Sequence, residues 1–429
     1  MNELEKNVYL QAKFIHDLTW EKLPEKVRKR ASWIVLDSMG CIWKGLDGKK
    51  VPKDTDDAII EITRAMVSTE LYEGNRMAIG HPACHILPYM LVQFQNCTVE
   101  KFLCAFVAAY ETAARWGRSV RFKNNILGHG TVMTTGVAAA MAILHDLSVQ
   151  ETYDLLLLSA SLPEVSVWQT VYQGSALHDI YAGCSAIETR HLLPLLKSGV
   201  KSNGAIITDV YKGIMNASIY PELLAEKLEQ DYLICQNYFK VHTGCRFIHP
   251  FADVLKKQLE DGLEKEKISS INIYTYKKAS QISAESVPNE LAAKFSTPVS
   301  IAVLLEKGEL SPDSIRNCQK DQAVAQWKGK IHLYEDEKYN KILPDQRGGR
   351  VEINFSDGHS RVMEVFHAVG DFDNPQPYTL KDLTIKFQRN VEAQVDEKEI
   401  QVLEKNVLEE PENHILNQSI RLFYEKVGI

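Results

Sequence analysis

The chain has 429 residues, which is long for a single hydrophobic core, so we expect two domains. Hydrophobic residues make up 45% and charged residues 24%, as is ordinary for a globular protein and unlike a disordered one. The net charge is −7, and no cluster of Lys and Arg offers the concentrated positive charge that a nucleic-acid partner needs. The negative net charge does not exclude an anionic substrate, because a local pocket can carry positive charge in an acidic protein.

The first residues, MNELEKNVYLQAKFIHDL, are amphipathic and charged throughout, and they lack the apolar region of a signal peptide. No stretch approaches the roughly 18 uncharged apolar residues of a membrane span. The cysteines are scattered without a CxxC pair, which indicates buried thiols rather than a disulfide framework. We therefore expect a cytoplasmic protein that has no membrane partner.

Almost all periodic signals up to about residue 259 are helical. Thr98 is expected to cap one helix, and Gly74 to end another. Ser148 followed three residues later by Glu151 fits a capping box. The predicted helices cover 25–43, 55–74, 98–117, 129–148, 148–166 and 178–200.

The pattern changes near Lys267, where apolar and polar residues begin to alternate. An Asp-Gly turn at Asp357–Gly358 is expected to join two of the strands. A helix is predicted over 287–308, and the chain returns to helix after residue 390. The predicted strands lie within 268–280, 328–339 and 350–369.

Together these signals predict a mainly α fold with two domains. Residues 1–265 and 392–429 form a large all-helical domain from both chain ends. Residues 266–391 form a smaller inserted α+β lid domain with an antiparallel sheet.

The stretch FKVHTGCRFIHP, residues 239–250, concentrates polar side chains between apolar ones. Its His242, Cys245 and His249 have a spacing that could place three zinc ligands on one helical face. A zinc-dependent hydrolase that uses these three residues is therefore one alternative. The tripeptide HTG reads as a turn, however, and the spacing matches no common zinc signature.

Acid–base chemistry is the other class that the sequence supports, since it contains no GxSxG, P-loop or GxGxxG in the required context. Several His, Lys and Cys residues stand at loop–helix junctions, where side chains can face a cleft. His titrates near neutral pH, and a buried Lys can have a lowered pKa. These residues are His81, His129, His178, Lys240, Cys245 and His249.

Seven segments occur along the chain in this order: VLDSMGCIWKG, GHPACHILPYML, AFVAAYETAARWG, GHGTVMTTGVAAAMAILHDLS, LHDIYAGCSA, YFKVHTGCRFIHP and AAKFSTPVSIAVLL. In that order they resemble the MmgE/PrpD family, which includes 2-methylcitrate dehydratase, cis-aconitate decarboxylase and iminodisuccinate epimerase. No single piece is specific, but together they span nearly the whole chain.

The resemblance implies a site in a cleft between a helical domain and an α+β lid, no cofactor, and a homodimer. It implies a lyase or isomerase that removes a proton next to a carboxylate of a small carboxylic acid. Dehydration, epimerisation or decarboxylation then follows. Such chemistry requires a base, a proton donor on the other face and cations that hold carboxylates.

His81, His129 and Lys240 resemble active-site positions of the family. His178 stands where the family has a Lys, and Cys245 stands where it often has a His. In this interpretation Lys240 or His129 is the base, Cys245 or His178 is the opposite acid, and His81 orients the substrate. A Cys at the acid position makes epimerase or isomerase chemistry more attractive.

Other departures from the family affect substrate binding. The segment between Asp37 and His81 is short and lacks the family's Asp-rich loop, and no Tyr stands near Pro298, where the family's lid helix has one. A degenerate paralogue with a binding role is therefore a further alternative. Arg suits bidentate carboxylate binding. The candidate substrate-binding residues are Arg76, Arg118, Arg121, His242 and Arg246.

Overall fold

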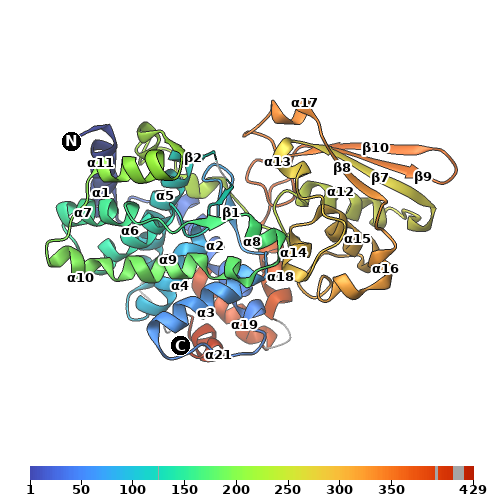
Figure 1. The fold of residues 1–429 in the computed structure, drawn as a ribbon. Helices are drawn as coiled ribbons and strands as arrows, with labels where there is room; N and C mark the ends of the chain where they lie inside the picture. The colour runs from blue at the N-terminus through green and yellow to red at the C-terminus, as the bar shows by residue number, and fades with distance from the viewer. Residues whose placement is uncertain (124, 392–394, 409–419) are drawn as a thin grey trace.

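The computed structural model describes residues 1–123, 125–391, 395–408 and 420–429 (Figure 1). Its elements form two groups, each around its own hydrophobic core. The first core joins helices from both chain ends, and the second joins the helices and sheet between them. In Figure 1 the blue, green and red helices lie together on one side, and the yellow and orange sheet with its helices lies on the other. The predicted mainly α fold is confirmed.

The first group is a packed set of helices. Thr98 caps α5 and Ser148 forms the predicted capping box of α7, so these local signals are confirmed. Its longer helices are α1 (Glu3–Asp17), α2 (Glu25–Leu46), α3 (Thr55–Ser68), α4 (Pro82–Gln93), α5 (Val99–Ser119), α6 (Thr134–Leu144), α7 (Val149–Ala160), α9 (Tyr181–Arg190), α18 (Leu380–Val391) and α19 (Glu397–Leu408). Shorter ones are α10 (Leu192–Lys197), α11 (Gly204–Thr208) and α21 (Arg421–Val427). Val171 of α8 (Gln169–Tyr172) belongs to the second core instead.

The second group contains a four-stranded sheet in the order β10-β9-β7-β8. Its strands are β7 (Ile268–Thr275), β8 (Ile331–Glu335), β9 (Gly349–Phe355) and β10 (Ser360–Val365). The predicted antiparallel pairing joins β10 to β9 and β9 to β7, but the sheet is mixed, because β7 and β8 are parallel. A parallel pair needs a long crossover, and the chain supplies one through α15 (Thr297–Lys307). Helices α12 (His249–Glu260) and α15 pack against this sheet.

Two of the longer helices also pack with a different group from the one in which the sequence division would place them. Leu383 and Phe387 of α18 belong to the first core, and α18 packs against α2. Phe251 and Leu255 of α12 belong to the second core. The division into 1–265 with 392–429 and 266–391 stays a proposal, and its parts at 392–394 and 409–419 lie outside the described residues.

The predicted helix over 55–74 is too long, since α3 ends at Ser68. Glu70 follows with a φ of +51°, and Gly74 begins the short strand β1 (Gly74–Asn75), which pairs with β6 (Asn237–Tyr238). Periodicity could not reveal this end, because a buried extended segment is as apolar as a buried helix. Within the described ranges, no helix combines the length and apolar character that crossing a membrane requires.

Candidate active site

A cavity of about 260 Å³ receives side chains from both groups of elements. Four of the five predicted catalytic residues line it, namely His81, His129, Lys240 and Cys245. The full lining is Glu70, Ile79, Gly80, His81, Leu127, Gly128, His129, Trp168, Tyr238, Lys240, Cys245, Arg246, Phe247, Tyr276, Lys278, Phe295, Leu343, Pro344 and Arg347.

His81 stands at the start of α4, where Pro82 begins the helix. Its Nδ1 lies 2.7 Å from the carbonyl oxygen of Glu73. A carbonyl only accepts hydrogen bonds, so Nδ1 carries the proton and Nε2 keeps a lone pair. Burial, with the nearby charge of Lys240, lowers the pKa of His81 to about 3. His81 is therefore a neutral imidazole with one nitrogen available as a base.

His129 lies beside His81, with the two ring centroids 5.3 Å apart. Its Nε2 is 3.0 Å from Tyr72 Oη. His85 bonds the backbone near both histidines: its Nδ1 donates to the His81 carbonyl at 2.9 Å, and its Nε2 accepts from the amide of Gly130, which follows His129, at 2.8 Å. With both of its nitrogens engaged, His85 connects the start of α4 to the backbone that follows His129.

Lys240 and Glu70 form a buried ion pair, with Nζ 2.6 Å from Oε2. Tyr72 Oη donates to the other carboxylate oxygen at 3.2 Å. Burial alone would raise the pKa of Glu70, but Lys240, helped by His178 and His81, lowers it to about 2. As half of an ion pair, Lys240 presents a positive charge rather than a free lone pair, so it suits electrostatic stabilisation better than the role of base.

His178, the fifth predicted catalytic residue, is fully buried and does not line the cavity. Its Nδ1 is 2.9 Å from Asp179 Oδ1, and its Nε2 is 3.6 Å from Glu70 Oε1. It therefore lies behind the cavity wall, in contact with Glu70, His129 and Phe295, and has no direct access to a substrate.

Cys245 lines the cavity, and its amide donates to the Lys294 carbonyl at 2.7 Å. Burial raises the pKa of the thiol to about 11. The group is therefore protonated at neutral pH and can serve as a proton donor. No other cysteine lines this cavity among the described residues.

The predicted zinc ligands do not converge. His242 Nε2 pairs with Asp253 Oδ1 at 2.9 Å, and His242 lines a different groove of about 470 Å³. His249 Nε2 lies 3.3 Å from the Gly244 carbonyl. In the described part of the chain, His242, Cys245 and His249 do not bring their ligand atoms within 4.8 Å of one another. The geometry therefore does not support the zinc hydrolase alternative.

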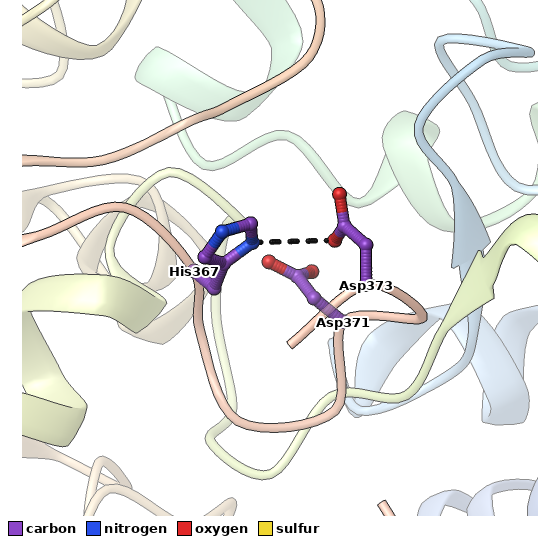
Figure 2. Close-up of side chains that lie close together, drawn as sticks. All are labelled: His367, Asp371 and Asp373. Atoms are coloured by element: carbon purple, nitrogen blue, oxygen red, sulfur yellow. Dashed lines mark hydrogen bonds and ion pairs between the residues drawn. The ribbon is translucent and has the colours of Figure 1, made fainter. Parts of the chain in front are cut away.

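One group of potential metal ligands does come together, and Figure 2 shows it: His367, Asp371 and Asp373. His367 Nδ1 lies 3.3 Å from Asp373 Oδ1. Both carboxylates already have cationic partners, since Asp371 pairs with Arg246 and Asp373 holds Arg76 through two contacts of 3.2 and 2.5 Å. These acids are better explained as anchors for the two arginines than as free metal ligands.

Only Arg246 among the predicted substrate-binding residues lines this cavity. Arg76 pairs with Asp373 and stacks over Phe372. Arg118 pairs with Glu226, at 2.5 Å. Arg121 donates to backbone carbonyls at the end of α5, and His242 lies in the other groove. Arg76, Arg118, Arg121 and His242 therefore do not line this cavity, and their predicted role in substrate binding stays a prediction.

Several polar cavity residues escaped the sequence analysis: Glu70, Tyr238, Tyr276, Lys278 and Arg347. One general signal could have found Glu70, because a buried ammonium is costly without compensation and a carboxylate partner supplies it. Arg347 lies in the loop between α17 (Glu337–Asn340) and β9, and nothing in its local sequence sets it apart.

Two family models match this chain. The MmgE/PrpD N-terminal domain matches residues 70–218, and the MmgE/PrpD C-terminal domain matches residues 242–410. The N-terminal match contains His81 and His129, and the C-terminal match contains Cys245 and Arg347. A search of the curated proteins finds no match.

Proposed function

The chain belongs to the MmgE/PrpD family, whose members are generally lyases of the dehydratase type acting on small acids, and on that basis we propose that it is a cofactor-independent lyase or isomerase. Its first step is the removal of a proton next to the carboxylate of a small carboxylic acid. One observation supports this above all: a neutral imidazole, a protonated thiol and several cations line the same cavity.

In the proposed reaction His81 Nε2 takes the proton, and the electron pair of the C–H bond moves into the carboxylate to give an enediolate. The cavity cations Lys240, Arg246 and Arg347 stabilise the added negative charge. A substrate carboxylate beside His81 favours its protonated form, so the imidazole becomes a stronger base once the substrate is bound. His81 thereby replaces Lys240 and His129 as our proposed base.

The intermediate has two outcomes. Proton donation from the Cys245 thiol to the opposite face completes an epimerisation. Loss of a β-hydroxyl, which leaves as water after receiving a proton, completes a dehydration. A thiol held protonated by burial supports the first outcome, and the family supports the second.

The degenerate-paralogue alternative predicts a collapsed cleft with unpaired side chains. The structure instead has an open cavity of about 260 Å³, and Lys240 is paired with Glu70, so these observations do not support that alternative. A homodimer and a cytoplasmic location remain proposals that follow from the family resemblance and the sequence.

Deuterium exchange tests the proposal. Purified protein in D2O is incubated with a panel of small carboxylic acids, and loss of the α-proton signal is followed by proton NMR. We expect exchange for at least one acid, and a fall of about 10²- to 10⁴-fold with His81→Gln. His242→Gln is the matched control, because His242 is a buried histidine outside the cavity. Exchange that His81→Gln leaves unchanged, or no exchange across the panel, would refute the proposal.

A further inference from the structure

Arg347 is a cavity cation that the protein leaves without an anion. Its Nη2 donates to the backbone carbonyl of Arg76 at 3.0 Å, and no carboxylate within the described residues pairs with it. Burial lowers the pKa of Arg347, and so do the neighbouring charges of Arg246 and Arg76. An uncompensated guanidinium in such a place is stabilised by a bound anion, which can accept two parallel hydrogen bonds.

Two of the other three cations of the cavity already pair with carboxylates. Lys240 pairs with Glu70, and Arg246 pairs with Asp371. Lys278 Nζ lies 4.8 Å from the centroid of the Trp168 ring, where the ring face partly compensates its charge. Arg347 is therefore the guanidinium of this cavity that no carboxylate of the described residues already occupies.

One part of the cavity wall is aromatic and apolar. The rings of Trp168 and Phe247 stack with centroids 6.3 Å apart, and Phe295 meets Trp168 edge-on at 6.5 Å. Leu127 and Leu343 extend this surface. The side chains of Phe247, Phe295 and Leu127 offer a carboxylate no hydrogen-bond donor, whereas an apolar group gains from burial against them.

The cavity volume limits the size of the ligand. About 260 Å³ corresponds to roughly nine water molecules at about 30 Å³ each. We propose that the substrate is a monocarboxylic acid of about ten non-hydrogen atoms, whose carboxylate binds Arg347 and whose apolar body lies against Trp168, Phe247 and Phe295. This inference rests on the proposed function, since it names the substrate class of the same site.

Isothermal titration calorimetry with three probes of similar size tests the substrate class. 3-Phenylpropanoate carries one carboxylate and an apolar body, 3-phenylpropan-1-ol has the body alone, and propane-1,2,3-tricarboxylate has three carboxylates. We expect 3-phenylpropanoate to bind at least tenfold more tightly than either of the others. Tighter binding of the tricarboxylate, or no binding of 3-phenylpropanoate, would overturn the inference.

Arg347→Gln should weaken 3-phenylpropanoate at least tenfold. Arg350→Gln is the matched control, because Arg350 lies three residues away, stacks over Tyr274 and does not line the cavity. If Arg347→Gln and wild type bind 3-phenylpropanoate with equal affinity, and circular dichroism shows that both are folded, Arg347 does not bind the carboxylate. Trp168→Ala is the second variant, and should weaken 3-phenylpropanoate while leaving the tricarboxylate unchanged.

The two proposals fail separately. If 3-phenylpropanoate binds but no carboxylic acid exchanges its α-proton, the chemistry is wrong and the ligand class stands. If polycarboxylates exchange in a His81-dependent manner and arylalkanoates do not, the chemistry stands and the ligand class is wrong.

Discussion

Glu70 and Lys240 lie 170 residues apart in the sequence, yet Lys240 Nζ is 2.6 Å from Glu70 Oε2 in the interior of the protein. The pair joins the segment after α3 to the stretch before α12. Removal of one member leaves the other as a buried charge without compensation, which is far more costly than the loss of a surface pair.

We predict that Glu70→Gln lowers the free energy of unfolding by about 3 kcal/mol at pH 7. The double variant Glu70→Gln with Lys240→Met should lose less stability than the separate losses of Glu70→Gln and Lys240→Met added together, because it buries no unpaired charge. Urea unfolding followed by circular dichroism measures all three. Glu25→Gln, which breaks the exposed pair with Lys29, should change nothing measurable. Additive single effects would contradict a coupled pair.

Glu73 should make stability depend on pH in an unusual direction. Burial raises its pKa from 4.5 to about 8, although the Ala83 amide and Tyr110 hydroxyl donate to it. The folded protein therefore holds a proton that the unfolded chain releases near pH 4.5. The stability from this group is complete below about pH 4.5 and is lost as the pH rises towards 8.

Glu73→Gln mimics the protonated acid and should remove this dependence. Between pH 5.5 and 7.5, wild type should lose on the order of 1 kcal/mol per pH unit relative to the variant. Urea unfolding of both proteins across this range gives the difference directly. A difference that stays constant with pH would show that Glu73 is ionised in the folded state.

Protonation of His81 should not lower the activity of the free enzyme at mildly acid pH. Its pKa of about 3, against an ordinary 6.5, keeps the imidazole neutral throughout the range in which the protein can be assayed. We expect that titration of His81 does not change kcat/KM for α-proton exchange between pH 7.5 and pH 5.5. An acid limb near pH 6.5 would indicate an imidazole that is solvated rather than buried.

Cys245 should react slowly with alkylating agents. Its pKa of about 11 leaves far less thiolate at pH 7.5 than an ordinary thiol with a pKa of 9.0 has. Iodoacetamide labelling, followed by mass spectrometry, should therefore be at least about tenfold slower at Cys245 than at the cysteine of an unstructured peptide. Rapid labelling would mean that the site holds a thiolate, and the role of proton donor would have to be withdrawn.

Asp371 should set the charge that the cavity offers to a ligand. In Asp371→Asn, Arg246 loses its anionic partner, while the Asn side chain can still accept from the Ala368 amide that Asp371 binds at 3.0 Å. Affinity for propane-1,2,3-tricarboxylate should therefore rise relative to 3-phenylpropanoate, as measured by calorimetry. Asp373→Asn is the matched control, because its partner Arg76 does not line the cavity. Equal effects of the two variants would argue against this role for Asp371.

The sequence revealed those parts of the molecule that are encoded locally. Ser148 and Thr98 begin their helices because their side chains bind amides three residues away, and such signals can be recognised in any short stretch. The Asp357–Gly358 turn likewise connects β9 and β10 as its dipeptide predicts.

What the sequence did not reveal depends on contacts between distant segments. Neither the parallel pairing of β7 with β8 nor the position of Arg347 in the cavity has a local signature. The four arginines proposed from the sequence were chosen by residue type, and Arg residues pair with acids as readily as with substrates. Asp373 and Glu226, which hold Arg76 and Arg118, lie far from them in the chain.

The bond from Arg347 to the carbonyl of Arg76 has one more consequence. It crosses between the two hydrophobic cores, and His81 belongs to the first group of elements while Arg347 belongs to the second. An acid that touches both residues links the two cores, so ligand binding should increase the cooperativity of unfolding. If the two cores unfold in separate thermal transitions without ligand, a single transition is expected when the acid is bound.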